Sequence, residues 1–434
     1  MSLGAFRLKK AVLVAILLAV VSVSFLSCGY SSAAYTPPSG LLQRVVISQR
    51  VSTGFTLGGL IILDAQNDTL PTRSGEISAG SSPGLLALSS NRATLLAFDS
   101  SNNSVQVINA TTEQNSGSIT LPGPTTSLAV PGTTGIGYAA VPTTSIIGTA
   151  PGAVEVMNLT SPSLIGSINV PSAQTVISNQ AGTQLLVFSN NSNSVAVISP
   201  GIAVAPVDTS CNTAPNRVCT MVSGFDKPVY AIYGSGTQAY VLNCGAECGG
   251  TQASVAVLDL TTLTITATIP VNGATMAFLS GTTLYVAGTP PGLTCMPATA
   301  QEPIGCGTLD IVDLNALTDT NFAAPISVPN GYHTRMDLST NGQLFVGSLK
   351  CTNLNNEQGN TRGCLAIYNT TNGNVVIPST NGDVTGLQSF VTRNVEYVVQ
   401  GTIVLIYDTT QDALQVDQFN FSGQMIDVKA LDFF

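Results

Sequence analysis

The sequence is poor in charge, in histidine and in helical patterning. Charged residues make up 9% of the 434-residue chain, histidine occurs once and tryptophan is absent. No long stretch places apolar residues at the spacing of an amphipathic helix, which excludes a mainly helical fold. Gly, Ser, Thr, Asn and Val dominate instead. The chain is therefore predicted to be all-β.

Basic residues are scarce, and those present are scattered. The chain has 14 Lys and Arg against 23 Asp and Glu, for a formal net charge of −9. Three of the basic residues, Arg7, Lys9 and Lys10, precede the apolar run from Ala11 to Leu26 and belong to a predicted export signal. Binding a phosphate backbone requires a basic stripe, which the remaining residues are too dispersed to form. We therefore exclude nucleic acid as a partner.

The apolar run is shorter than the ~20 residues of a membrane-spanning helix, which favours a cleaved signal over an uncleaved anchor. It ends in Phe25-Leu26-Ser27-Cys28-Gly29, which resembles the lipobox of bacterial lipoproteins. The resemblance implies a signal peptide over 1–27, lipid on Cys28 and a flexible tether over 28–43. Because Gly29 is not the Asp that favours inner-membrane retention, it also implies attachment at the outer membrane or cell surface.

An alternating apolar strand that ends in Asp, Asn or Ser recurs along the rest of the chain, 44–434. Each copy follows a second apolar strand, and many of these pairs are preceded by a third strand and a Gly or Asn-Gly turn of hairpin type. A fourth strand follows the Asp-ended one. The eight Asp-ended copies begin at Leu60, Ser104, Ala153, Ser194, Ser254, Thr308, Cys364 and Ile403.

Four strands per unit at this spacing predict a single β-propeller of four-stranded blades. The count gives eight blades, with seven as the alternative because the first unit is the weakest copy. The first unit starts at its second strand, near Val45, while the chain ends on a strand of the inner type, Met425 to Phe433. We therefore expect the C-terminal strand to pair with the strand around Val45 to Ser48 and close the ring.

The segment from Ala239 to Val271 (AYVLN…SVAVLDLTTLTITATIPV) resembles the YVTN-repeat propellers related to the lactonase-like family. The resemblance covers nearly all of the mature chain but is sharp only in this unit. Members of that family usually have seven blades. The resemblance implies a propeller fold and raises hydrolysis of a small ester or sugar acid as a possible activity.

Eight cysteines remain after Cys28, and an even number in an exported chain predicts disulfides. They form local couples: Cys211 with Cys219, Cys244 with Cys248, Cys295 with Cys306, and Cys351 with Cys364. A metal site is the alternative. We predict no metal, because there is no Cys-x2-Cys pair and the only histidine lies elsewhere. We also predict no cofactor.

Three of these couples fall in connections between the second and third strands of successive units, at 243–251, 288–307 and 348–363. Such connections emerge on one face of a propeller, and long stapled loops on one sector are a common way to build a binding surface. The alternative is that the disulfides only stabilise long loops of an exported protein. The polar residues that we expect to contact a ligand are Glu302, Lys350, Asn353, Asn355, Glu357 and Arg362.

Catalytic groups are sparse. No nucleophile elbow, phosphate loop or calcium loop occurs, and the repeated Asp at the strand ends indicates a turn role. In an inner-strand region, alternation would place His333, Arg335 and Asp337 on one face. These three residues are candidates to line the central channel, although a satisfied structural network is the more frequent outcome for such a trio.

The leading hypothesis is a lipid-anchored propeller that binds an envelope or extracellular protein, peptide or glycan without catalysis. The second hypothesis is a lactonase-like hydrolase, which would require a base, a nucleophile or a metal that the sequence does not cluster. The third is a structural surface-layer or adhesion component.

Overall fold

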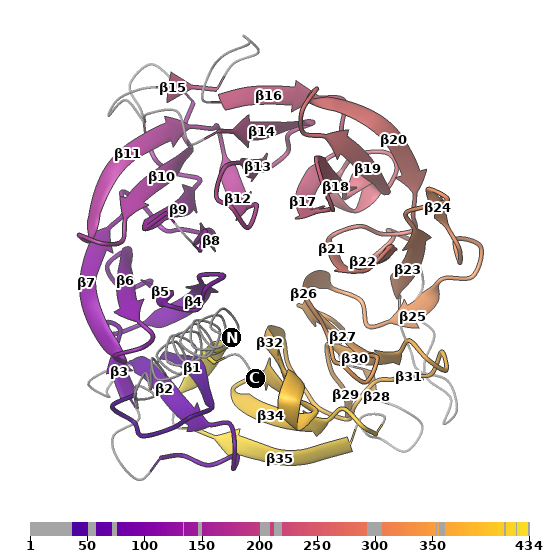
Figure 1. Ribbon diagram of the computed structural model, residues 1–434. Helices are drawn as coiled ribbons and strands as arrows, with labels where there is room; N and C mark the ends of the chain where they lie inside the picture. The colour runs from indigo at the N-terminus through magenta and orange to yellow at the C-terminus, as the bar shows by residue number, and fades with distance from the viewer. Residues whose placement is uncertain are drawn as a thin grey trace, which may run out of the picture.

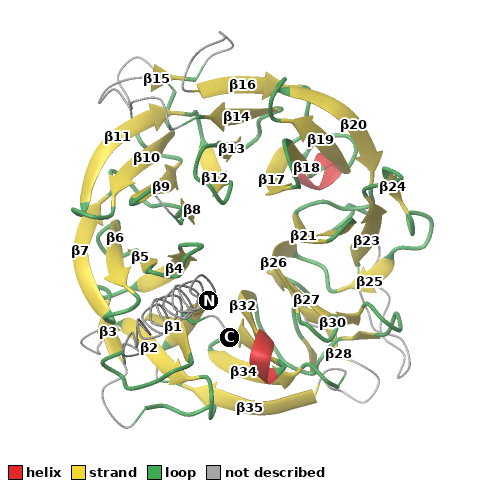
Figure 2. Ribbon diagram, viewed as in Figure 1, coloured by secondary structure: helices red, strands yellow, loops and turns green. Residues whose placement is uncertain are grey.

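The computed structural model describes residues 37–50, 58–71, 76–132, 134–145, 150–199, 209–211, 219–292, 306–352, 354–355, 361–411, 414–421 and 423–432. Over these ranges the strands form eight sheets of four or five strands, and these are arranged radially around a common centre (Figure 1). The two helices are short 3₁₀ turns, η1 (Gly245–Cys248) and η2 (Val391–Arg393) (Figure 2). The predicted all-β propeller of eight blades is confirmed.

Within each blade the strands run antiparallel from the centre outward. Blade 1 contains β36 (Gln424–Ala430), β1 (Arg44–Arg50), β2 (Gly59–Asp64) and β3 (Glu76–Ser78); blade 2 contains β4 (Pro83–Leu88), β5 (Thr94–Asp99), β6 (Ser104–Asn109) and β7 (Gln114–Thr120). Blade 3 contains β8 (Ser127–Ala129), β9 (Ile136–Val141), β10 (Ala153–Asn158) and β11 (Ser163–Asn169), with β15 (Thr209–Ser210) added in parallel at its edge. Blade 4 contains β12 (Ala173–Ser178), β13 (Leu185–Ser189), β14 (Ser194–Ile198) and β16 (Cys219–Ser223).

The second half of the ring repeats this order. Blade 5 contains β17 (Pro228–Tyr233), β18 (Gln238–Asn243), β19 (Ser254–Asp259) and β20 (Thr264–Pro270); blade 6 contains β21 (Met276–Ser280), β22 (Thr283–Gly288), β23 (Gly307–Asp313), β24 (Thr318–Asp319) and β25 (Ile326–Val328). Blade 7 contains β26 (Tyr332–Leu338), β27 (Gln343–Leu349), β30 (Leu365–Asn369) and β31 (Val375–Val376), and the hairpin β28 (Leu354–Asn355) with β29 (Thr361–Arg362) lies in the connection from β27 to β30. Blade 8 contains β32 (Val384–Phe390), β33 (Val395–Gln400), β34 (Ile403–Asp408) and β35 (Leu414–Asn420).

The core lies between the blades rather than within one layer. Both faces of the middle strands are buried, as the pattern of β18 and β19 shows. The buried apolar side chains form eight clusters, and each joins two neighbouring blades around the ring. Burial of apolar area therefore stabilises each blade only through its neighbours.

The repeated Asp or Asn at the end of the third strand forms a local turn in seven of the eight blades, and β14 of blade 4 lacks one. Asp259 Oδ1 accepts hydrogen bonds from the backbone N–H groups of Thr261 at 2.8 Å and Thr262 at 2.9 Å. Backbone N–H groups two residues further on also donate to Asp64, Asp313, Asp408, Asn109, Asn158 and Asn369. These are Asx turns, so the predicted turn role is confirmed. The residue four positions after Asp259, Leu263, has a positive φ of 55°.

These turns pack against the hairpin turns that join the two inner strands. Leu260 N donates to Thr237 O at 2.7 Å, and Thr409 N donates to Asn394 O at 2.7 Å. We call the face that carries them the turn face. The opposite face, which carries the connections 244–253, 289–306 and 350–364, is the loop face.

The ring is closed by its last strand. β36 pairs antiparallel with β1, with Val45 opposite Ala430 and Ile47 opposite Val428. Arg44 links the seam between β1 and β36 to blade 2. Its Nε and Nη2 donate to Asp432 at 2.9 and 2.6 Å, and its Nη1 donates to Glu113 of blade 2 at 2.9 Å. The predicted closure by the C-terminal strand is confirmed.

The predicted tether, 28–43, is described only from residue 37. Ser39 donates its backbone N–H and its hydroxyl to Glu113 at 2.7 and 2.6 Å, and Leu41 packs against the cluster between blades 1 and 2. This end of the tether is therefore bound to the propeller. The predicted signal peptide, 1–27, and Cys28 lie outside the described residues. Along the described ranges, no helix is long and apolar enough to cross a bilayer.

Candidate binding face and central cavity

A cavity of about 730 Å³ occupies the centre of the ring. Its wall takes residues from the innermost strand of every blade: Leu86, Ser127, Thr175, Tyr230, Met276, Arg335, Leu387 and Lys429. Asn190, Asn191 and Ser192 from the β13–β14 connection and Cys248 from the β18–β19 connection also line it. Because these connections belong to the loop face, the cavity reaches that face.

Bulges in the inner strands determine which side chains meet the cavity. The register shifts between Ala173 and Thr175, between Pro228 and Tyr230, and between His333 and Arg335. Runs of consecutive residues line the cavity at these shifts: Gln174 and Thr175, Lys227 to Tyr230, and Tyr332 to Met336. A bulge inserts one extra residue and re-aims the side chains next to it. The cavity wall is therefore denser in side chains than strict alternation allows.

The bulge in β26 separates the predicted channel trio. His333 is paired with Ser348, whereas Arg335 is paired with the preceding residue of β27, Gly347. Because one residue is inserted, His333 lies on the opposite side of the strand from Arg335 and Asp337. Strict alternation through residue 334 therefore does not hold, but two of the three channel candidates, His333 and Arg335, are among the residues that line the cavity, and Asp337 is not.

Arg335 lies at the cavity with its guanidinium anchored to backbone. Its Nε donates to Thr385 O at 2.7 Å and its Nη1 donates to Thr334 O at 3.0 Å, while its side chain remains 30% exposed. Its Nη2 is 3.8 Å from Asp427 Oδ2, a distance at which the charges attract without a good hydrogen bond. The anchoring fixes the plane of the guanidinium while leaving N–H donors directed elsewhere.

Asp427 on β36 links this cation to a second one. Its Oδ1 accepts a hydrogen bond from Lys429 Nζ at 3.2 Å, and its Oδ2 accepts one from the backbone N–H of Leu86 in blade 2 at 3.1 Å. The Asp427 side chain is 1% exposed. One buried carboxylate therefore positions two cations from blades 7 and 1.

Two further acids lie behind the cations. Burial raises the pKa of Asp337, although its Oδ2 accepts a hydrogen bond from Ser389 N at 2.7 Å. Glu396 is fully buried, and both desolvation and the nearby Asp337 charge raise its pKa well above the usual value. Burial therefore favours the neutral form of Glu396, which weakens its effect on the cavity cations.

His333 is a buried structural residue. Its Nε2 lies 3.0 Å from Pro329 O, and a Cβ built on Gly307 would lie 2.9 Å from its Cε1. It is 1% exposed, and burial lowers its pKa to about 4, partly offset by the bond to Pro329. The imidazole is consequently neutral and, although His333 is among the residues that line the cavity, it is almost fully buried, which is unsuited to general-base catalysis.

The loop face of blades 5 to 7 is tied together by hydrogen bonds. Glu247 in η1 accepts from the backbone N–H of Thr289 at 2.7 Å, and the Thr289 hydroxyl donates to Gly331 O at 2.7 Å. These contacts link the β18–β19, β22–β23 and β25–β26 connections. Burial raises the pKa of Glu247 to about 7, with the Thr289 bond opposing the shift.

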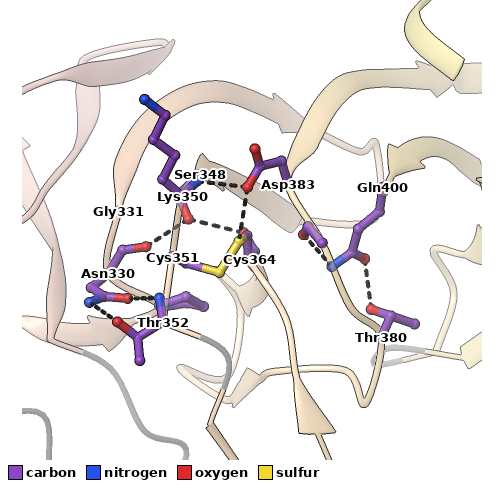
Figure 3. Close-up of a disulfide and its surroundings, with 12 residues drawn as sticks. Asn330, Gly331, Ser348, Lys350, Cys351, Thr352, Cys364, Thr380, Asp383 and Gln400 are labelled. Carbon is purple, nitrogen blue, oxygen red and sulfur yellow. Dashed lines mark hydrogen bonds between the residues drawn. A yellow bond between two sulfur atoms is a disulfide. The ribbon is translucent and has the colours of Figure 1, made fainter. Parts of the chain in front are cut away.

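The next connection is anchored at its base by a disulfide, Cys351–Cys364 (Figure 3). Asn330 and Thr352 exchange two hydrogen bonds, of 3.1 and 2.7 Å. Asp383 accepts the Lys350 backbone N–H at 2.7 Å, while the Lys350 side chain is exposed and extends away from the disulfide in Figure 3. The loop therefore leaves the propeller from a fixed base.

Three of the four predicted disulfides are confirmed: Cys211–Cys219, Cys244–Cys248 and Cys351–Cys364. Cys306 is also disulfide-bonded, and its predicted partner Cys295 lies outside the described residues. The described connections occupy the loop face as predicted.

The predicted ligand-contact residues are only partly described. Lys350 is exposed on the loop face. Asn355 and Arg362 lie in the β28–β29 hairpin, where the backbone but not the side chains is described. Asn353, Glu357 and Glu302 lie outside the described residues.

The structure adds four polar residues at the cavity that sequence reasoning missed: Lys227, Tyr230, Asp427 and Lys429. The alternation of Asp427 and Lys429 in the predicted closing strand was an available signal, because inner-strand side chains that alternate toward the channel must face its centre. Lys227 and Tyr230 flank a bulge, which no local pattern marked.

No family profile matches the chain, and no curated protein matches it. Among solved structures it is similar to the dihydro-heme d1 dehydrogenase NirN in complex with DHE, with a TM-score of 0.61 and 10% identity over 89% of this chain and 75% of that one. It is also similar to the computationally designed Ika8 protein, with a TM-score of 0.51 and 10% identity over 82% and 94% of the two chains. The shared feature is the propeller fold. At these identities the likeness shows the fold alone.

Proposed function

We propose that this chain is a lipid-anchored cell-envelope propeller that binds a ligand or partner without catalysis, through the central cavity and the loop face of blades 5 to 7. The observation that carries the proposal is the cavity itself, since residues of all eight innermost strands wall it and it reaches the face that holds the stapled loops. Large, preformed concave sites with a few placed polar groups are the usual form of a binding site.

Rigidity of the surrounding rim supports this role. A continuous series of hydrogen bonds links blade 5 to blade 7. It joins Glu247 with Thr289, Thr289 with Gly331, and Asn330 with Thr352. A surface ordered before binding loses less conformational entropy when a partner docks. We expect an envelope or extracellular protein, peptide or glycan as the partner.

The buried state of His333 argues against the hydrolase alternative. A lactonase-like mechanism would need a group that can take a proton from water or substrate, and His333 is neutral, 1% exposed and bonded to Pro329 O. His333→Ala should therefore leave any weak lactone hydrolysis of the purified chain unchanged. Loss of hydrolysis in that variant would favour the enzyme instead.

Position-specific cross-linking tests the binding face. A benzophenone amino acid that replaces Lys350, exposed on the loop face, should give discrete cross-linked species in intact cells. The matched control replaces Asn372, which is exposed in a turn-face loop of the same blade. Equal cross-linking from both positions, or cross-linking only from Asn372, would overturn the assignment of the face.

The proposed anchor is tested separately. The charged start, the apolar run and Phe25-Leu26-Ser27-Cys28 coincide in the sequence, so mass spectrometry of the envelope protein should find lipid on an N-terminal Cys28. Cys28→Ala should release the protein from the membrane fraction. An unmodified Cys28 in envelope material would refute the anchor without affecting the binding face.

A further inference from the structure

Three basic side chains meet at the cavity, against one acid. Lys227, Arg335 and Lys429 line it, whereas Asp427 is the one acid among its lining residues in the described part of the chain. The whole sequence has 14 basic residues and a net charge of −9, so a cationic cavity does not follow from composition. This inference rests on the proposed binding role of the cavity.

Two of these cations use only some of their hydrogen-bond donors within the protein. Arg335 gives one Nε and one Nη1 hydrogen bond to backbone carbonyls and approaches Asp427 only to 3.8 Å, and its side chain is 30% exposed. Lys429 Nζ makes one 3.2 Å bond to Asp427 and its side chain is 24% exposed. An ammonium has three donors and a guanidinium five, so both retain donors for a bound anion.

Neighbouring acids offset this charge only in part. The Asp226 carboxylate, next to Lys227, feels the lysine charge but also accepts hydrogen bonds from Thr251 and from Gln252 N on the loop face. Desolvation favours the neutral forms of Asp337 on β26 and Glu396 on β33, while the Lys429 charge opposes that shift at Asp337. Among the lining residues in the described part of the chain, Asp427 is the acid that faces the three cations.

Apolar side chains lie next to the cations in the cavity wall. Leu387 comes from blade 8, between the blades that supply Arg335 and Lys429, Leu86 comes from blade 2 beside Lys429, and Met276 comes from blade 6 beside Arg335. Tyr230 lies close enough to Arg335 for the guanidinium charge to act on its phenol. The volume of about 730 Å³ is in the range of sites that hold small organic molecules. A ligand that matches this part of the wall has an apolar body and one negative group.

We propose that the cavity binds a small organic anion, with its carboxylate or sulfonate at Arg335 and Lys429 and its apolar body against the leucine and methionine side chains. Planar guanidinium groups hold such anions with two parallel hydrogen bonds, and the low exposure of the site strengthens them.

A pair of fluorescent probes tests the proposal. 1-Anilinonaphthalene-8-sulfonate and N-phenyl-1-naphthylamine share one aromatic body, and only the first has a sulfonate. The wild-type propeller should bind the sulfonate probe at a single site and about tenfold or more tighter than the neutral probe, which is the more hydrophobic of the two. Arg335→Gln and Lys429→Gln should each weaken the sulfonate probe about tenfold and leave the neutral probe within about twofold.

Two controls keep the result specific. Arg50→Gln also removes one positive charge, from a residue outside the cavity lining, and should leave both probes unchanged. Met276→Trp narrows the cavity and should abolish both. If Arg335→Gln and Lys429→Gln, still folded by circular dichroism, bind the sulfonate probe as wild type does, the anion proposal is refuted while the cavity remains a binding site. If Met276→Trp binds both probes normally, the probes lie elsewhere and the proposal also fails. Neither result bears on the cross-linking test.

Discussion

Replacing Arg44 by Met should be among the most destabilising single changes in the chain. Arg44 is 5% exposed and donates to Asp432, to Glu113 and to Ala110 O, so it joins the closing seam of blade 1 to blade 2. Methionine approximates the apolar stem but removes the charge. The variant leaves Glu113 and Asp432, with 4% and 16% side-chain exposure, without the Arg44 cation, while Arg92 stays close enough for its charge to act on Asp432.

Removing one partner of a buried ion pair typically costs 3 to 5 kcal/mol, mainly because the remaining charge is buried and unpaired. Ser39 still donates two hydrogen bonds to Glu113, and Asp432 keeps some access to water. We therefore expect the lower end, a loss of about 3 kcal/mol in the free energy of unfolding. If unpaired charge is the cause, adding Glu113→Gln and Asp432→Asn should recover at least half of the loss.

Urea unfolding followed by far-ultraviolet circular dichroism measures the loss in the free energy of unfolding, since the chain has no tryptophan to report by fluorescence. Arg50→Met is the matched control, because Arg50 is half-buried and, among the described residues, makes one long 3.3 Å bond, to Ser100, and should cost under about 1 kcal/mol. A loss at Arg44 no larger than that at Arg50, or a triple variant no more stable than the single one, would refute the reasoning.

Four further predictions follow from described contacts. Burial lowers the pKa of His333 to about 4, so the fold holds it neutral and loses stability as the pH falls below 6.5. Between pH 7 and 4.5, the free energy of unfolding of wild type should fall about 2 to 3 kcal/mol more than that of His333→Gln in urea titrations. Equal losses in the two proteins would contradict this prediction. Leu317 is 42% exposed with a φ of 53°, so Leu317→Gly should raise the melting temperature slightly rather than lower it as a leucine truncation normally does. Replacing Cys351 and Cys364 together by Ser should cost about 2 to 3 kcal/mol in urea unfolding, and a reducing agent should narrow the gap to wild type. Deleting the chain from residue 424 onward should expose the edge of β1 and abolish cooperative unfolding, and a cooperative transition in the deletion variant would contradict closure by β36.

Much of the fold could be predicted because propeller strands follow a short-range pattern. Alternation with period two identifies strands such as β18 and β19, and the Asp that ends β19 makes its hydrogen bonds to residues two and three positions later. Both signals are local, so they survive in a single sequence. The closing pair of β1 and β36 could also be predicted, because the incomplete ends of the repeat are complementary.

The site was less accessible to sequence reasoning for two physical reasons. The bulge at residue 334 inserts one residue into β26, which reverses the side to which His333 points, and no residue type requires a bulge there. The cavity combines residues from eight strands, such as Tyr230 and Lys429. These residues are far apart in the sequence and meet only at the centre of the folded ring. Of the six loop positions predicted from polarity, by contrast, three lie outside the described residues and two are described by their backbone only.

The closing strand also determines when the cavity can exist. Asp427 and Lys429 belong to β36, and the backbone N–H of Asp427 donates a hydrogen bond to the hydroxyl of Ser48, which precedes it by 379 residues. A chain whose seam is open lacks this wall and the carboxylate that positions Arg335. Ligand occupancy and ring closure are therefore thermodynamically linked, so that a bound anion resists opening of the seam, and a loosened seam releases the anion.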